Sequence, residues 1–107
     1  MKERRGDEAL ALCRQATAQD PLSADARYWL GHALSRHGLL FEAVASFERA
    51  SELGPEGAVV HQCLALTYER LGFQRSARQE WAHAIESCRD PRRRRAMQAR
   101  LEKLLFL

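Results

Sequence analysis

The stretch from Leu30 to Pro55 reads LGHALSRHGLLFEAVASFERASELGP, and the stretch from Leu64 to Arg89 repeats its residue classes as LALTYERLGFQRSARQEWAHAIESCR. Equivalent positions lie 34 residues apart. The matched pairs are Leu30 with Leu64, Gly38 with Gly72, Ala43 with Ala77, Phe47 with Trp81, and Ala50 with Ala84. A fixed period of this length indicates that one supersecondary unit is repeated along the chain.

The period extends upstream of the quoted stretch. The earlier positions that match Ala43, Phe47, Ala50 and Pro55 are Ala9, Cys13, Ala16 and Pro21. The sequence therefore predicts a single domain over 1–107. It comprises the second helix of a partial unit (6–22), two whole units (24–57 and 58–90) and a closing helix (91–107).

Each whole unit divides into two helices at a glycine. Between residues 25 and 37 the apolar residues Ala26, Trp29, Leu30, Ala33 and Leu34 recur at helical spacing. Gly38 follows, at a position where a left-handed residue ends a helix, and Gly72 repeats it. A second helix is predicted over 41–53, before the break Gly54-Pro55-Glu56-Gly57. Ser23 and Asp90 occupy the expected N-cap positions.

The small residues have a mechanical reason, because two helices joined by a short turn must pack closely. Gly31 or Ala65 on the first helix leaves room for that approach, as do Ala43 and Ala50 or Ala77 and Ala84 on the second. Phe47 or Trp81 is then expected to fill the space against the next unit. One such hairpin does not bury its apolar face alone, so neighbouring units are expected to stack.

The pattern Leu30-Gly31-x-x-Leu34, Gly38, Ala43-x-x-x-Phe47, Ala50, Pro55 resembles the tetratricopeptide repeat, or TPR, as does its second copy. The resemblance covers residues 7–91. It implies an all-α fold, a short right-handed solenoid of helix-turn-helix hairpins. Arg27 and His61 stand where the family usually has an opening Trp, and Arg89 where it has a Pro.

Composition narrows the class further. Of the 107 residues, 46% are hydrophobic and 29% charged, a globular balance. No apolar run approaches the roughly 20 residues that span a bilayer, and the charged start is not typical of a secretory signal. The three cysteines, Cys13, Cys63 and Cys88, form no C-x-x-C pair. Small buried thiols in a reduced, cytoplasmic compartment are the expectation.

The motifs of common enzymes and cofactor sites are absent from the sequence. No phosphate-binding loop, dinucleotide fingerprint, H-E-x-x-H or G-x-S-x-G occurs. His32 and His37 are five residues apart, as are His83 and Cys88, a spacing that does not place two ligands on one helix face. We therefore expect no catalytic residues, no cofactor and no metal.

In the TPR family, the first helices of successive units line a concave groove that binds peptides or helices of partner proteins. The resemblance implies these groove residues: Tyr28, His32, Arg36, Gln62, Leu66, Glu69, Arg70 and Arg100. Tyr28, His32 and Leu66 stand where some TPR domains clamp a carboxylate with Lys and Asn, so such a clamp is not expected. The prediction is a non-catalytic interaction module or adaptor. A small secretion-type chaperone that dimerises is the alternative.

Arg92, Arg93, Arg94 and Arg95 place four cations in the first turn of a helix, where the macrodipole favours anions. Either this is a solvated helix start capped by Asp90, or it binds an acidic or phosphate-bearing partner. Nucleic acid is the alternative of a different class, and it is disfavoured because no aromatics interleave with the run.

The two end helices carry apolar stripes. Met97, Leu101, Leu104 and Leu105 predict that the closing helix packs on the second unit, and a membrane-surface helix is the weaker alternative. The apolar residues of the opening helix cover more than one face and comprise Leu10, Leu12, Cys13 and Ala16. Self-association as a homodimer through this helix would bury them.

Overall fold

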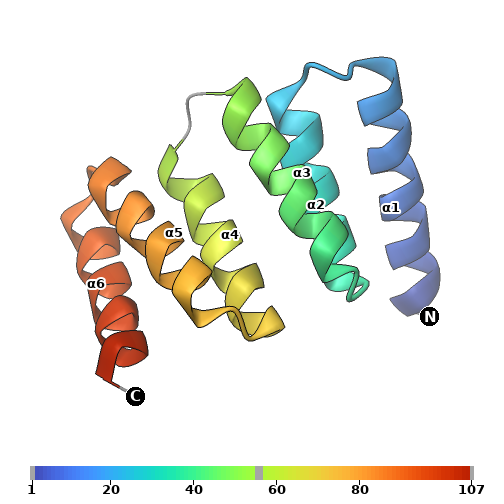
Figure 1. Ribbon diagram of the computed structural model, residues 1–107. Helices are drawn as coiled ribbons and strands as arrows, with labels where there is room; N and C mark the ends of the chain where they lie inside the picture. The colour runs from blue at the N-terminus through green and yellow to red at the C-terminus, as the bar shows by residue number, and fades with distance from the viewer. Residues whose placement is uncertain (1, 55–56, 107) are drawn as a thin grey trace. The chain divides into compact units, whose positions relative to one another are not determined.

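The structure, a computed structural model, describes residues 2–54 and 57–106, with side chains over 5–54 and 58–106. Within those ranges it contains helices and no strand, so the all-α prediction is confirmed (Figure 1). The helices are α1 (Lys2–Gln19), α2 (Ala24–Arg36), α3 (Leu40–Leu53), α4 (Gly57–Leu71), α5 (Gln74–Ser87) and α6 (Pro91–Phe106).

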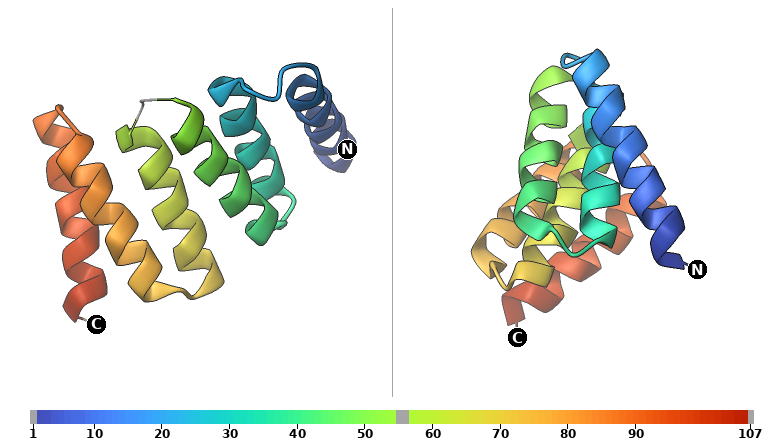
Figure 2. Two further views of the ribbon diagram at one scale, coloured as in Figure 1. Left: turned by 45° about the horizontal axis from the view of Figure 1, so that its top comes forward. Right: turned by 90° about the vertical axis from the view of Figure 1, so that its right-hand side faces the viewer.

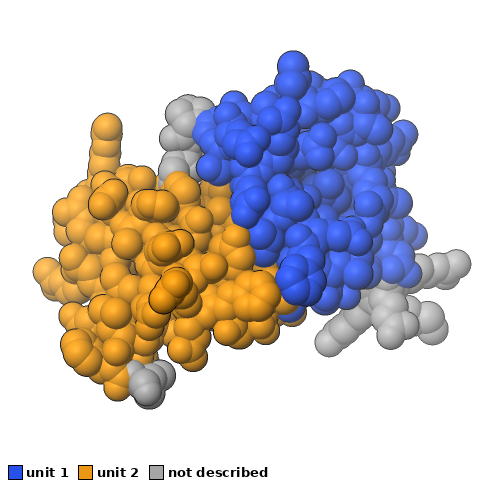
Figure 3. All heavy atoms as spheres, viewed as in Figure 1, with its two compact units in different colours: residues 1–55 blue, residues 56–107 orange. Residues whose placement is uncertain are grey.

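The chain divides into two compact units, Met1–Pro55 and Glu56–Leu107, coloured separately in Figure 3. In the first unit α2 packs against both α1 and α3, and in the second α5 packs against both α4 and α6 (Figures 1 and 2). We describe each unit by itself. The single-domain organisation over 1–107 stays a prediction.

The turn inside each hairpin is made by a left-handed glycine, as predicted. Gly38 has a φ of 76° and Gly72 a φ of 82°. The next residue closes each turn, since the Leu39 N–H donates to the Leu34 carbonyl at 3.0 Å and the Phe73 N–H to the Tyr68 carbonyl at 2.9 Å. Residues with a Cβ are strained at such a φ, so both positions favour glycine.

Both predicted N-caps are confirmed. Ser23 Oγ accepts a hydrogen bond from the Ala26 N–H at 3.1 Å, and Asp90 Oδ1 accepts one from the Arg92 N–H at 3.0 Å. Of the predicted break over 54–57, Pro55 and Glu56 lie outside the described residues. The opening helix begins at Lys2 rather than at residue 6, because the polar first turn continues the helix without a breaker.

The core of the first unit is built on a close approach between α2 and α3. Phe47 is fully buried, and its ring lies where a side chain on Gly31 would be: an added Cβ would come within 2.7 Å of Phe47 Cε1. In contrast, Trp29, which the spacing assigned to the apolar stripe of α2, is 59% exposed. It lies at the edge of the stripe, one position beyond the buried face.

The core of the second unit gathers around Trp81, packed with Ala65, Ala84, Cys88 and Met97. Leu101 and Leu104 are partly buried against this cluster, so α6 packs on the second unit as predicted. Leu105 is exposed, which corrects the predicted stripe. Of the three thiols, only Cys88 is buried, whereas Cys13 and Cys63 are half-buried.

Candidate functional site

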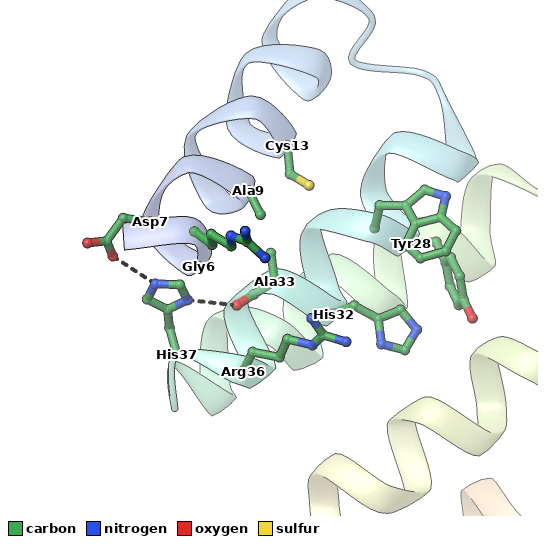
Figure 4. Close-up of a pocket in the computed structure, with 11 residues that line it drawn as sticks. Gly6, Asp7, Ala9, Cys13, Tyr28, His32, Ala33, Arg36 and His37 are labelled. Carbon is green, nitrogen blue, oxygen red and sulfur yellow. Dashed lines mark hydrogen bonds and ion pairs between the residues drawn. The ribbon is translucent and has the colours of Figure 1, made fainter. Parts of the chain in front are cut away.

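An open hollow of about 1280 Å³ lies between α1 and α2 (Figure 4). We call it the unit-1 groove. Its lining residues from α1 are Arg5, Gly6, Asp7, Ala9 and Cys13, and those from α2 and its C-cap are Tyr28, Trp29, His32, Ala33, Arg36 and His37. α2 contributes Leu30, Ala33 and Leu34 to the buried core, whereas α1 is mostly exposed and packs on α2.

The three groove residues predicted in the first unit all line this hollow. Tyr28, His32 and Arg36 follow each other at intervals of four, which places them along one face of α2. Figure 4 shows the three side chains on the same side of that helix. The predicted groove was one lined by the first helices of successive units, whereas this hollow lies between α1 and α2, so partner binding by these three residues stays a proposal.

Aromatic rings from α2 form part of the groove lining. The Tyr28 and His32 rings meet edge to face with centroids 4.6 Å apart, and His32 meets Phe47 in the same way at 5.3 Å. The Trp29 ring lies 5.2 Å from that of Tyr28. Edge-to-face contacts of this kind favour one arrangement of the rings by about 0.5–1.5 kcal/mol per pair. Trp29 thus presents a large exposed apolar surface beside Tyr28 and His32.

The groove combines these aromatic rings with charged side chains, the cations Arg5 and Arg36 and the carboxylate of Asp7. Burial lowers the pKa of His32, and the nearby Arg36 guanidinium lowers it further. The His32 imidazole is therefore neutral near pH 7, when one ring nitrogen donates and the other accepts. Arg5 and Arg36 are exposed and supply the positive charge.

His37 fastens α1 to the end of α2. Its Nε2 lies 2.9 Å from Asp7 Oδ1, and its Nδ1 lies 3.1 Å from the Ala33 carbonyl (Figure 4). The Asp7 hydrogen bond, followed by the Ala33 carbonyl, raises the pKa of His37. Sequence reasoning missed this contact because Asp7 and His37 are 30 residues apart. The available signal was His37 itself, which follows the last turn of a predicted helix, where positive charge is favoured.

The second unit has a smaller hollow of about 220 Å³ between α4 and α6. Its lining includes three of the predicted groove residues, Gln62, Leu66 and Arg100. Gln62 Oε1 accepts a hydrogen bond from Arg93 Nη2 at 3.3 Å. Leu66 and Arg70 are exposed on α4.

Glu69 links all three helices of the second unit. Its Oε2 accepts a hydrogen bond from the Trp81 indole at 2.7 Å, and its Oε1 pairs with Arg100 Nη2 at 2.9 Å. Only 17% of the Glu69 side chain is exposed. Glu69 and Arg100, predicted to contact a partner, are thus engaged in a contact that holds α6 against α4 and α5.

The four arginines at the start of α6 differ in the contacts that they make within the second unit. Arg94 is half-buried, and its guanidinium donates to the Cys88 carbonyl through Nε and Nη2. Arg93 contacts Gln62, whereas Arg92 and Arg95 are exposed. Asp90 caps the helix, so its first turn is formed despite the four positive charges.

The comparisons with known proteins agree with this architecture. The tetratricopeptide repeat family model matches residues 1–67. The chain belongs to the tetratricopeptide repeat family. A comparison with curated protein sequences finds no match to this TPR chain.

Solved structures extend the likeness beyond residue 67. MamA AMB-1 superposes with a TM-score of 0.74 at 30% identity over 81% of this chain and 51% of its own. MamA MSR-1 superposes with a TM-score of 0.72 at 30% identity, over 79% of this chain and 49% of its own. TTC0263, a thermophilic TPR protein of Thermus thermophilus, superposes with a TM-score of 0.82 at 22% identity, over 98% of this chain and 52% of its own. The chain spans about half the length of these structures.

Tetratricopeptide repeats are protein–protein interaction modules, and this chain belongs to that family. Across the described residues, no helix has the length and apolar character needed to cross a membrane. The TPR pattern in the sequence did not indicate two parts of the groove lining. These are the residues of α1 and Trp29 of α2. The partial repeat at the start of the chain was the signal that α1 would lie against α2.

One group of possible metal ligands occurs in the part of the chain that the structure describes. It comprises His61 on α4 with Glu80 and His83 on α5. Sequence reasoning considered only neighbouring His and Cys pairs, and so did not combine these residues. The Glu80-x-x-His83 spacing on one helix face was the signal present in the sequence.

Proposed function

We propose that this TPR chain is a non-catalytic adaptor that binds a peptide or helical segment of a partner protein in the unit-1 groove. The observation that carries the proposal is the exposed Trp29, held beside Tyr28 and His32 in an open groove of about 1280 Å³. Aromatic and arginine side chains dominate the energetics of protein interfaces, and both line this groove.

The groove also indicates the chemistry of the segment. Trp29 and Tyr28 favour an apolar or aromatic side chain, because burial of such surface drives association. Arg5 and Arg36, which also line the groove, favour a carboxylate on the same segment. We infer an amphipathic segment that carries both acidic and large apolar residues.

The second unit contributes to the proposal in two ways. Leu66 and Arg70 are exposed and are proposed to contact a partner. Gln62, Glu69 and Arg100 are proposed to act by holding α6 in position through the contacts they make within the unit.

The test begins with selection of binding peptides from a random displayed library, followed by calorimetric titration of one synthetic peptide. We expect Trp29→Ala and Arg36→Glu each to weaken binding by more than about tenfold. Phe41→Ala is the matched control, since Phe41 is also an exposed aromatic side chain but lies on α3. Equal affinity of the original chain and Trp29→Ala, or an equal loss in Phe41→Ala, contradicts the proposal.

A second candidate is self-association through α1, as in a dimerising secretion-type chaperone. Leu12 favours it, because it is 65% exposed on that helix. Light scattering distinguishes a monomer from a dimer, since the single chain has a mass of 12.2 kDa. Dimerisation through α1 predicts twice that mass and its loss in Leu12→Glu. A mass near 12.2 kDa at high concentration contradicts it.

The arginine run gives weaker support to a phosphate-binding or nucleic-acid-binding function. Two of its four members are hydrogen-bonded inside the unit, to Gln62 and to the Cys88 carbonyl. Exchange of Arg92 and Arg95 for Glu leaves these contacts in place. We expect this double variant to bind the selected peptide normally.

A further inference from the structure

We propose that His61, Glu80 and His83 form a zinc-binding site on the second unit. The site belongs to the α4–α5 hairpin and lies outside both hollows described above. Glu80 and His83 are separated by three positions on α5, so both side chains emerge from neighbouring places on one face. His61 comes from α4, the other arm of the hairpin.

The distances between the ligand atoms suit a single ion. His61 Nδ1 lies 2.6 Å from Glu80 Oε2, and His83 Nδ1 lies 3.9 Å from the same oxygen. All three ligand atoms fall within 4.8 Å of one another. Tetrahedral zinc with bonds of about 2.0–2.2 Å separates its ligands by roughly 3.3 Å. Movements on the order of 1 Å therefore convert the observed cluster into a coordination shell.

The three side chains differ in exposure in a way that favours binding. His61 and Glu80 are 21% and 18% exposed, and they emerge from two helices packed tightly against each other. Their positions are therefore largely set before an ion arrives, which lowers the cost of forming the site. His83 is 56% exposed, so it leaves an entry path and is able to turn toward the ion.

The other repeat gives an internal comparison. The residues 34 positions earlier than His61, Glu80 and His83 are Arg27, Ser46 and Arg49. A TPR hairpin in this same chain thus forms with none of the three ligands. The hairpin fold therefore does not demand them, and their convergence in the second repeat calls for another explanation.

The donor set identifies the class of ion. Two imidazoles and one carboxylate match the ligands of zinc, whereas calcium and magnesium take all-oxygen shells. Three protein ligands leave a fourth tetrahedral position for water or for a side chain of a bound protein. When zinc binds, Glu80 exchanges its short contact with His61 for a bond to the metal.

The test uses the full chain, stripped with a chelator and kept reduced with a phosphine. Zinc chloride is titrated calorimetrically at pH 7.5, and helicity is checked by circular dichroism. We expect one zinc per chain, with affinity weakened more than about tenfold in His83→Ala and in Glu80→Gln. His83→Ala removes an exposed side chain and Glu80→Gln keeps the shape, so both variants should fold. His32→Ala is the matched control and should bind zinc as the original chain does.

Cobalt(II) provides a second readout that separates these ligands from thiols. Ligation by His61, Glu80 and His83 gives visible d–d bands without the near-ultraviolet band of a cobalt–thiolate bond. A thiolate band, loss of zinc binding in Cys63→Ser, or zinc affinity that is unchanged in both His83→Ala and Glu80→Gln would overturn the proposal. So would failure of the folded chain to bind zinc at all.

Discussion

The indole nitrogen of Trp81 donates a hydrogen bond to Glu69 at 2.7 Å, and this joins the buried centre of the second unit to a residue on its predicted binding face. The same carboxylate pairs with Arg100 on α6. A residue that the TPR pattern assigns to a partner contact thus also satisfies a buried donor. Binding and stability are coupled at this position.

This coupling predicts that Glu69→Ala destabilises the chain. The change leaves the buried Trp81 N–H without its acceptor and removes the Arg100 ion pair, so we expect a loss of about 1–3 kcal/mol in the free energy of unfolding. Urea denaturation measures it. Glu102→Ala, an exposed carboxylate on α6, should change the same quantity by less than about 0.5 kcal/mol. Equal effects of the two changes would contradict this account.

Gly31→Ala should also destabilise the chain, because the new methyl group would overlap the Phe47 ring. Overpacking of this kind costs about 1–3 kcal/mol. Gly6→Ala is the matched control, since its methyl group would meet only the tip of the His37 side chain, at 3.1 Å. We expect its effect on unfolding free energy to stay within about 1 kcal/mol. A stabilising Gly31→Ala would refute the packing described.

The contact between His37 and Asp7 predicts a pH-dependent stability. A pKa raised above 6.5 adds stability that is fully present below pH 6.5 and is lost as the pH rises through the folded-state pKa of His37. The pKa of His32 is lowered, so this residue has the opposite effect on the pH dependence of stability. Its contribution to the free energy of unfolding is lost as the pH falls below 6.5. Comparison of the original chain with Asp7→Asn isolates the His37 contribution.

The melting temperature of the original chain should exceed that of Asp7→Asn most clearly below pH 6.5. The difference should shrink as the pH rises to about 8. Thermal melts of both proteins across this range check it. A difference that grows with pH would show that protonated His37 does not favour the folded state.

Arg27 predicts a stabilising substitution. Its Nε is buried, and among the described residues it has no hydrogen-bond partner. An unsatisfied buried donor costs about 1–3 kcal/mol, and Arg27→Met removes it while keeping an unbranched apolar stem. We expect unfolding free energy to rise by about 1 kcal/mol. Arg49→Met, which removes an exposed pair with Glu52, should not raise it.

Particular residues explain what the sequence could predict. The period of 34 and the turn glycines gave the hairpins, because helix spacing and left-handed turns are local properties. The spacing of Tyr28, His32 and Arg36 likewise predicted that they share one face of a helix. In contrast, Asp7 and His37 meet through the packing of α1, and His61 reaches Glu80 across 19 residues. Such contacts depend on the tertiary arrangement rather than on local pattern.

Nitrogen-15 NMR titration of the chain with a library-selected peptide tests the central claim most directly. Trp29 and Trp81 give separate indole N–H signals, one exposed in the unit-1 groove and one bonded to Glu69. We predict that the Trp29 signal and the amides of α2 around His32 shift, while the Trp81 signal moves little. Shifts confined to Arg92–Arg95, with Trp29 unchanged at saturation, would contradict binding in this groove.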